Sequence, residues 1–188
     1  MKHIKCIVVG DHLVGKSCLI YTYLCRSFPN SSPPIVLEGT YDKIIKCDDI
    51  PINHIIDDVN GKDDYKHIRH FKYPKTDVFI ICFSLVSRIT FENVKKVWVP
   101  EIEEYCPSIP YILVGTKSDL KRDQEHNLGD NVFVSTTEGE LMMNEIRAQK
   151  YIECSSLRNE NVDEVFNSAF RVVLQNETNY SQKRCCLY

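Results

Sequence analysis

The sequence predicts a single α/β domain with a six-stranded, mainly parallel sheet flanked by about five helices. Six short apolar or β-branched runs, each a strand candidate, alternate with segments of helical periodicity. Alternation of this kind implies crossover connections, parallel strand pairing and helices on both faces of the sheet. The length of 188 residues fits one domain with a full hydrophobic core.

The strand candidates are short, and they lie at residues 4–9, 43–46, 52–56, 77–84, 111–115 and 151–154. The run 77–84 is nearly continuous in apolar residues, which is typical of a strand covered on both faces. Asp48-Asp49 predicts the turn between the second and third strands. The longest apolar run, Val78 to Phe83, is far shorter than the roughly 20 residues that span a bilayer.

Helices are expected where apolar residues recur every three or four positions, at 17–26, 65–72, 91–106, 138–148 and 162–173. The segment 121–135 is polar and predicts at most a short, weak helix. Residues after 174 lack periodicity and are expected to fray. We therefore expect a domain over residues 1–174 and a flexible tail over residues 175–188.

The net charge and the cysteine pattern exclude some classes of protein. The net charge of −3 gives no basic footprint for nucleic acid, so no nucleic-acid partner is expected. Nine cysteines with no CxxC pair predict free thiols and a reducing, cytosolic environment instead of a disulfide framework. The first residues lead directly into a strand candidate and do not resemble a signal peptide.

The clearest motif is Gly10-Asp11-His12-Leu13-Val14-Gly15-Lys16-Ser17, which satisfies GxxxxGK[ST] between a predicted strand and a predicted helix. In such a loop consecutive backbone N–H groups converge on phosphate oxygens, and the helix N-terminus adds positive partial charge. Lys16 would reach the β- and γ-phosphates, and the Ser17 hydroxyl would bind Mg²⁺. The motif predicts nucleoside triphosphate binding.

A second motif, Thr116-Lys117-Ser118-Asp119, follows the fifth strand candidate and indicates the base. A carboxylate at Asp119 accepts the two donors on the N1/N2 edge of guanine, which adenine does not offer. Lys117 would lie along the base and support the phosphate loop. Cys154-Ser155-Ser156, after the last strand, would complete a guanine site.

Each of these motifs follows a predicted strand, and in this order they make the chain resemble a small GTPase of the Ras superfamily and, within it, the Rho/Rac family. The resemblance covers residues 3–174 and includes the runs 73–79, 81–87, 91–94 and 112–117. It implies the P-loop small-GTPase fold with GTP or GDP and Mg²⁺ as ligands. The nucleotide-binding residues that it implies are Gly10, Asp11, His12, Leu13, Val14, Gly15, Lys16, Ser17, Cys18, Phe28, Asp58, Gly61, Thr116, Lys117, Asp119, Leu120, Ser155 and Ser156.

Some of these residues have individual roles by resemblance. Phe28 would pack on the guanine, and the backbone of Ser156 would donate to guanine O6. Asp58, which keeps the DxxG spacing with Gly61, would hold Mg²⁺ through water beside Ser17. Effectors would engage a second helix region at 65–71 and the first switch, which comprises Ser32, Pro33, Pro34, Ile35, Val36, Leu37, Glu38, Gly39, Thr40 and Tyr41.

Three positions depart from the family pattern. His12 stands where a glycine follows the Asp of the loop, and its ring would fill space that hydrolysis needs. Ile35 stands in place of the threonine whose hydroxyl ligates Mg²⁺ and whose N–H meets the γ-phosphate. Lys62 replaces the glutamine that orients the attacking water. The sequence therefore predicts GTP binding with slow hydrolysis and little response to a GTPase-activating protein. Two alternatives stay open: a normally cycling GTPase and a nucleotide-insensitive scaffold.

The C-terminal Cys185-Cys186-Leu187-Tyr188 has the C-a-a-X form and predicts prenylation of Cys185. Lys183 and Arg184 add a weak basic patch, worth about 1 kcal/mol per charge near an anionic leaflet. The resemblance further implies effectors, exchange factors and a GDP-dissociation inhibitor as partners. It places the protein, as a monomer, on the cytoplasmic face of the plasma membrane or other membranes, with a cytosolic fraction.

Overall fold

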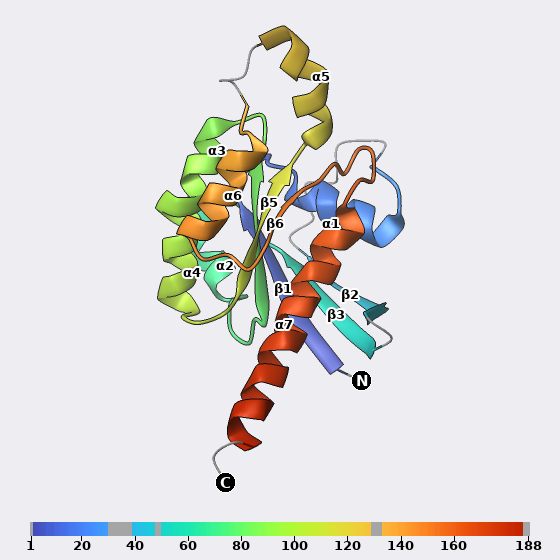
Figure 1. Cartoon of the computed structure of the whole chain (residues 1–188), viewed down its shortest axis with the longest axis vertical. Coiled ribbons are helices and arrows are strands. Elements are labelled where there is room, and N and C mark those ends of the chain that lie inside the picture. The colour runs from blue at the N-terminus through green and yellow to red at the C-terminus, as the bar shows by residue number, and fades with distance from the viewer. Residues whose placement is uncertain (1, 30–38, 48–49, 129–132, 186–188) are drawn as a thin grey trace.

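The computed structural model describes residues 2–29, 39–47, 50–128 and 133–185, which form a six-stranded sheet between two layers of helices (Figure 1). The sheet order is β2-β3-β1-β4-β5-β6, and of these pairs β2–β3 is antiparallel and the others are parallel. The strands are β1 (Lys2–Gly10), β2 (Thr40–Cys47), β3 (Ile50–Asp58), β4 (Val78–Ser84), β5 (Tyr111–Thr116) and β6 (Tyr151–Glu153). The predicted α/β architecture is confirmed; the predicted turn at residues 48–49 lies outside the described residues.

The helices are α1 (Lys16–Cys25), η1 (Asp63–Tyr65), α2 (Lys66–His70), α3 (Arg88–Asn93), η2 (Val94–Trp98), α4 (Val99–Tyr105), α5 (Ser118–Leu128), α6 (Thr136–Glu145) and α7 (Val162–Cys185). The element η1 is a single 3₁₀ turn. The element η2 is a π-helix that joins α3 and α4, so residues 88–105 form one continuous helical stretch with a π-helical middle.

Two helical segments differ from the sequence-based expectation. α5 is a regular helix where a polar, weakly helical excursion was expected. Its residues are largely straight-chain helix formers, whose intrinsic propensity needs no apolar stripe. α7 continues through Cys185, well beyond the periodic segment 162–173 that predicted this helix.

The core consists of two apolar layers, one on each face of the sheet. Alternation along β1 supplies both layers, because successive strand side chains point to opposite faces. Ile4, Cys6 and Val8 pack on the face covered by α1 and α7. Ile7 and Val9 pack on the face covered by α3, η2, α4 and α6 (Figure 1). All of β4 is buried, as predicted for a central strand.

A histidine lies inside the first layer. His54 of β3 is fully buried, and its ring centroid lies 4.1 Å from that of Phe170 and 5.8 Å from that of Tyr23. Neither ring nitrogen has a hydrogen-bond partner among the described residues. Burial, and then the nearby Lys43 ammonium, lower the pKa of His54 to about 3.

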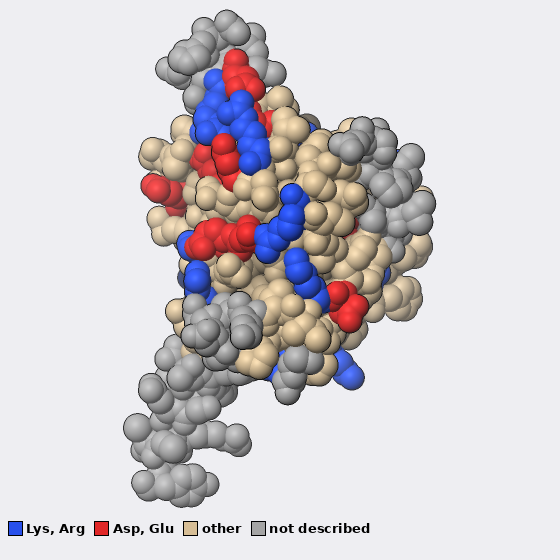
Figure 2. All heavy atoms as spheres, turned by 90° about the vertical axis from the view of Figure 1, so that its right-hand side faces the viewer, with Lys and Arg blue, Asp and Glu red and all other residues tan. Residues whose placement is uncertain are grey.

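The outer surface has mixed charge. On the face shown in Figure 2, Lys and Arg side chains alternate with Asp and Glu over a largely uncharged surface. Within the described part of the chain, every helix is too short or too polar to cross a bilayer.

Candidate nucleotide site

The phosphate loop connects the carboxyl end of β1 to the start of α1. Gly10 and Gly15 have φ values of 141° and 106°, which only glycine adopts without strain. A Cβ atom at Gly10 would lie 2.1 Å from the carbonyl oxygen of Cys82, so the neighbouring strand β4 also requires glycine here. Because β1 lies at the point where the strand order reverses, the loop stands where open α/β sheets bind ligands.

Lys16 is buried beneath this loop. Its Nζ donates hydrogen bonds to the carbonyl oxygens of Gly10 and Asp11, each at 2.8 Å. Burial lowers the pKa of Lys16, although the Asp58 carboxylate opposes that effect. Burial deprives the Lys16 ammonium of hydrating water, and negatively charged phosphate oxygens would stabilise the charge in place of that water.

Two oxygen ligands suited to a hard cation meet beside the loop. The Ser17 hydroxyl donates to Asp58 Oδ2 at 2.6 Å, although the two residues come from α1 and β3. Asp57 points to the opposite face of the sheet, where Thr40 donates to it and Lys5 lies 3.4 Å away. The structure therefore brings Ser17 and Asp58 together, and Asp57 contacts Thr40 and Lys5 instead.

The segment after β5 is attached directly to the phosphate loop. The Thr116 hydroxyl donates to the carbonyl oxygen of Val14 at 2.5 Å, and Lys117 Nζ donates to that of Leu13 at 2.8 Å. On its far side, Ser155 Oγ donates to Asp119 Oδ1 at 2.6 Å, and both residues are buried. The two sequence motifs and the serine after β6 thus form one continuous site.

Of the positions expected to serve hydrolysis, the structure describes His12 in the phosphate loop and Lys62, which follows Gly61 where that glycine packs on the loop. A Cβ atom at Gly61 would lie 2.2 Å from the carbonyl oxygen of Gly10 and 2.8 Å from the amide nitrogen of His12. The Lys62 amide donates to Asn60 Oδ1 at 3.0 Å, which closes a tight local turn. Partial burial, and then the cations Lys62 and Lys16, lower the pKa of His12.

The remaining predicted residues lie around this centre with varied exposure. Val14 is buried, while Leu13 and Phe28 are 75% and 37% exposed. Cys18, Leu120 and Ser156 are half-buried. Of the first switch, Gly39, Thr40 and Tyr41 are described, and residues 32–38, Ile35 among them, lie outside the described part. Cys185 ends α7, and residues 186–188 lie outside it as well.

This fold and this loop define a P-loop nucleotide-binding protein. A sequence model of the Ras family matches residues 5–175, which is nearly the whole chain. The chain therefore belongs to the Ras family of small GTP-binding switches, which bind guanine nucleotide and usually Mg²⁺. The residues present fit both ligands: a buried ammonium for phosphate, a hydroxyl and a carboxylate for the cation, and the buried Asp119 carboxylate for the guanine edge.

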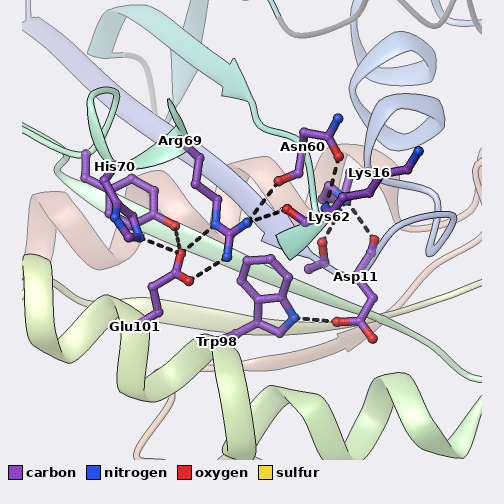
Figure 3. Close-up of polar contacts among 10 residues, drawn as sticks. Asp11, Lys16, Asn60, Lys62, Arg69, His70, Trp98 and Glu101 are labelled. Atoms are coloured by element: carbon purple, nitrogen blue, oxygen red, sulfur yellow. Dashed lines mark hydrogen bonds and ion pairs between the residues drawn. The ribbon is translucent and has the colours of Figure 1, made fainter. Parts of the chain in front are cut away.

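Sequence reasoning missed a polar network that borders this site (Figure 3). Arg69 and Glu101 form a buried, two-bonded ion pair at 2.7 and 2.6 Å. Trp98, which the periodicity assigned to an apolar stripe, donates its indole N–H to Asp11 Oδ1 at 2.7 Å. Asn93 also donates to Asp11, at 2.6 Å. No sequence motif indicated these contacts, because they connect residues that are far apart in the chain.

Proposed function

We propose that this chain is a Rho/Rac-type GTP-binding signalling switch that hydrolyses GTP slowly and responds little to a GTPase-activating protein. The observation that carries the proposal is the placement of Lys62. Its amide is fixed by Asn60 and its carbonyl oxygen accepts from Arg69 Nη1 at 3.0 Å, so the backbone at position 62 is held beside the phosphate loop. A lysine side chain has three donors and no acceptor, so it does not take a proton from water.

The binding half of the site supports nucleotide retention. Lys16 and the backbone of the loop would hold the phosphates, and Asp119 would accept from the guanine edge. Ser17 and Asp58 would hold Mg²⁺, which when bound neutralises phosphate charge. These contacts do not depend on Lys62 or His12, so binding and hydrolysis are separable.

The hydrolytic half of the site lacks the chemistry that speeds phosphoryl transfer. Intrinsic GTP hydrolysis in this fold is only about 10⁻⁴ s⁻¹, and an activating arginine raises it by up to about 10⁵-fold. Loss of that factor is worth roughly 7 kcal/mol of activation free energy. The backbone of His12 lies next to Gly61, and its imidazole would take space that an arginine from a partner would have to enter.

The Rho/Rac assignment extends the proposal to partners and location. It predicts effectors of actin-cytoskeleton or polarity type at the two switch regions, with exchange factors and a GDP-dissociation inhibitor as further partners. Prenylation of Cys185 would attach the protein to the cytoplasmic face of the plasma membrane or other membranes. A helix that extends to Cys185 would then connect the lipid to the domain.

The decisive experiment identifies the nucleotide that co-purifies with the full-length protein and then measures single-turnover GTP hydrolysis. We expect bound GTP and a slow rate, with faster hydrolysis in Lys62→Gln and in Lys62→Gln combined with His12→Gly. Lys66→Gln, an exposed lysine on α2, is the matched control and should leave the rate unchanged. Bound GDP with rapid hydrolysis would favour a cycling GTPase, and protein without nucleotide would favour a scaffold.

A further inference from the structure

Asp11 of the phosphate loop makes contacts that a phosphate ligand would not need. Its two carboxylate oxygens accept hydrogen bonds from Trp98 Nε1 and Asn93 Nδ2, at 2.7 and 2.6 Å. Both donors come from the helical stretch 88–105, which lies on the far side of β1 and β4 from α1 (Figure 1). The carboxylate therefore attaches the phosphate loop to this helix.

The π-helical segment η2 makes this double contact geometrically possible. Asn93 and Trp98 are five residues apart, and in an α-helix such residues lie about 140° apart around the axis and face different sides. In a π-turn the hydrogen bond joins residues five apart, so such residues approach the same side. The single π segment of this stretch, Val94–Trp98, begins directly after Asn93 and ends with Trp98. The local change of helix type thus directs both side chains to one carboxylate.

The same tryptophan also contacts residues 58–71, which include Lys62 and Arg69 and are called the second switch below. The Arg69 guanidinium lies 4.8 Å from the centre of a Trp98 ring, and Figure 3 shows the indole between Arg69 and Asp11. Arg69 is fixed by its buried, two-bonded pair with Glu101. Its Nη1 donates to the carbonyl oxygens of Lys62 at 3.0 Å and Asn60 at 3.5 Å.

We propose that the stretch 88–105 couples the phosphate loop to the second switch, with Asn93, Trp98 and Arg69 as positioning residues. Asn93 and Trp98 hold the loop through Asp11, and Trp98 and Glu101 hold Arg69 against the carbonyl groups of Asn60 and Lys62. The two segments that would border the terminal phosphate then move as one unit. The role of this coupling at a bound nucleotide rests on the function proposed above. The coupling between the two segments itself does not depend on that function.

Amide hydrogen exchange of the full-length protein tests the coupling. Trp98→Phe keeps an aromatic ring near Arg69 and removes the indole N–H that donates to Asp11, together with part of the buried ring system. We expect exchange in residues 59–65 to become about tenfold faster, equivalent to about 1.4 kcal/mol of local stability. Asn93→Asp, which opposes one carboxylate with another, should have the same effect. Arg69→Lys should in turn accelerate exchange in residues 10–14.

The controls separate coupling from a general loss of stability. Lys96→Ala removes an exposed side chain on the same helical stretch and should change neither segment. Exchange in β5 should stay at its original rate in every variant. A response to Trp98→Phe confined to residues 10–14, or an equal acceleration that includes β5, would overturn the proposal. Guanine nucleotide affinity, measured on the same samples, reports separately on the proposed function.

Discussion

The Ser155 hydroxyl donates a hydrogen bond to the Asp119 carboxylate at 2.6 Å, and both groups are buried. A second contact, from the amide of Arg158 to Ser155 Oγ at 3.0 Å, fixes the hydroxyl from the other side. The carboxylate is thus held in one orientation by the protein before any ligand arrives. Pre-organised acceptors of this kind discriminate by leaving a buried group unpaired when the wrong ligand binds.

Removal of the Asp119 carboxylate should abolish recognition of the guanine 2-amino group. Asp119→Ala is expected to weaken GDP binding by about tenfold to a hundredfold, the value of a hydrogen bond to a charged group. Inosine diphosphate, which lacks that amino group, should lose less affinity, so the preference for GDP over inosine diphosphate should shrink. Titration of both nucleotides measures this. Asp123→Ala, on the exposed part of α5, is the control, and an unchanged preference in Asp119→Ala would contradict the assignment.

Chelation of Mg²⁺ should expose the role of Ser17 and Asp58. In the original protein, EDTA is expected to accelerate nucleotide release, because the cation that Ser17 and Asp58 would hold no longer balances the phosphates. Ser17→Ala should release nucleotide faster without chelator and respond less to EDTA. The dissociation rate of a fluorescent GDP, with and without EDTA, gives the result. An equal EDTA response in both proteins would mean that Ser17 is not a ligand.

The elements that position the site follow from local sequence patterns. The phosphate loop, the acceptor at Asp119 and the separation of Asp58 from Asp57 could each be predicted, since each depends on a short motif between a strand and a helix. The contacts of Trp98 and Asn93 could not, because a spacing of five matches no α-helical or β-strand period. They arise from the π-helical segment, which the sequence pattern does not indicate.

The structure differs from the sequence-based expectation at further places, because apolar periodicity does not indicate polar helices or contacts between distant residues. An apolar stripe was the criterion for helices, so the polar α5 and the continuation of α7 were missed even though their backbones are helical. His54 occupies an inward-facing position on β3, which the sequence analysis did not single out. Its burial depends on Phe166 and Phe170 of α7, which lie more than a hundred residues later in the chain.

His54 should make stability depend on pH. Its pKa is about 3 in the folded protein and near 6.5 when unfolded, so below pH 6.5 the unfolded state binds the proton that the folded state does not. The contribution of His54 to stability is complete above pH 6.5 and is lost by about 1.4 kcal/mol per pH unit as the pH falls towards 3. Relative to the original protein, His54→Leu should therefore gain about 2 kcal/mol of unfolding free energy between pH 7 and pH 5. Urea unfolding at both pH values tests this, with the exposed His67→Leu as control.

Removal of one partner of the Arg69–Glu101 ion pair should destabilise the fold strongly, whereas replacement of both residues by apolar ones should destabilise it much less. Burial raises the pKa of Glu101, but the hydrogen bonds from Arg69 and Tyr73 outweigh it and leave the pKa below its ordinary value. Arg69→Met alone leaves a buried carboxylate uncompensated and should cost about 3–5 kcal/mol of unfolding free energy. Adding Glu101→Leu should recover much of that loss. Chemical denaturation of the two single variants and the double variant gives a double-mutant cycle of unfolding free energies. If the loss in the double variant equals the sum of the two single losses, the expectation is contradicted.

Trp98 is the only tryptophan among the 188 residues, and its indole contacts both the phosphate-loop aspartate and the arginine of the second switch. Emission excited selectively in the tryptophan band, at wavelengths that the ten tyrosines do not absorb, consequently originates at a single indole that borders the nucleotide site. Shifts in its intensity or wavelength would follow ligand exchange in real time, so the chain carries its own optical probe for the kinetics discussed above.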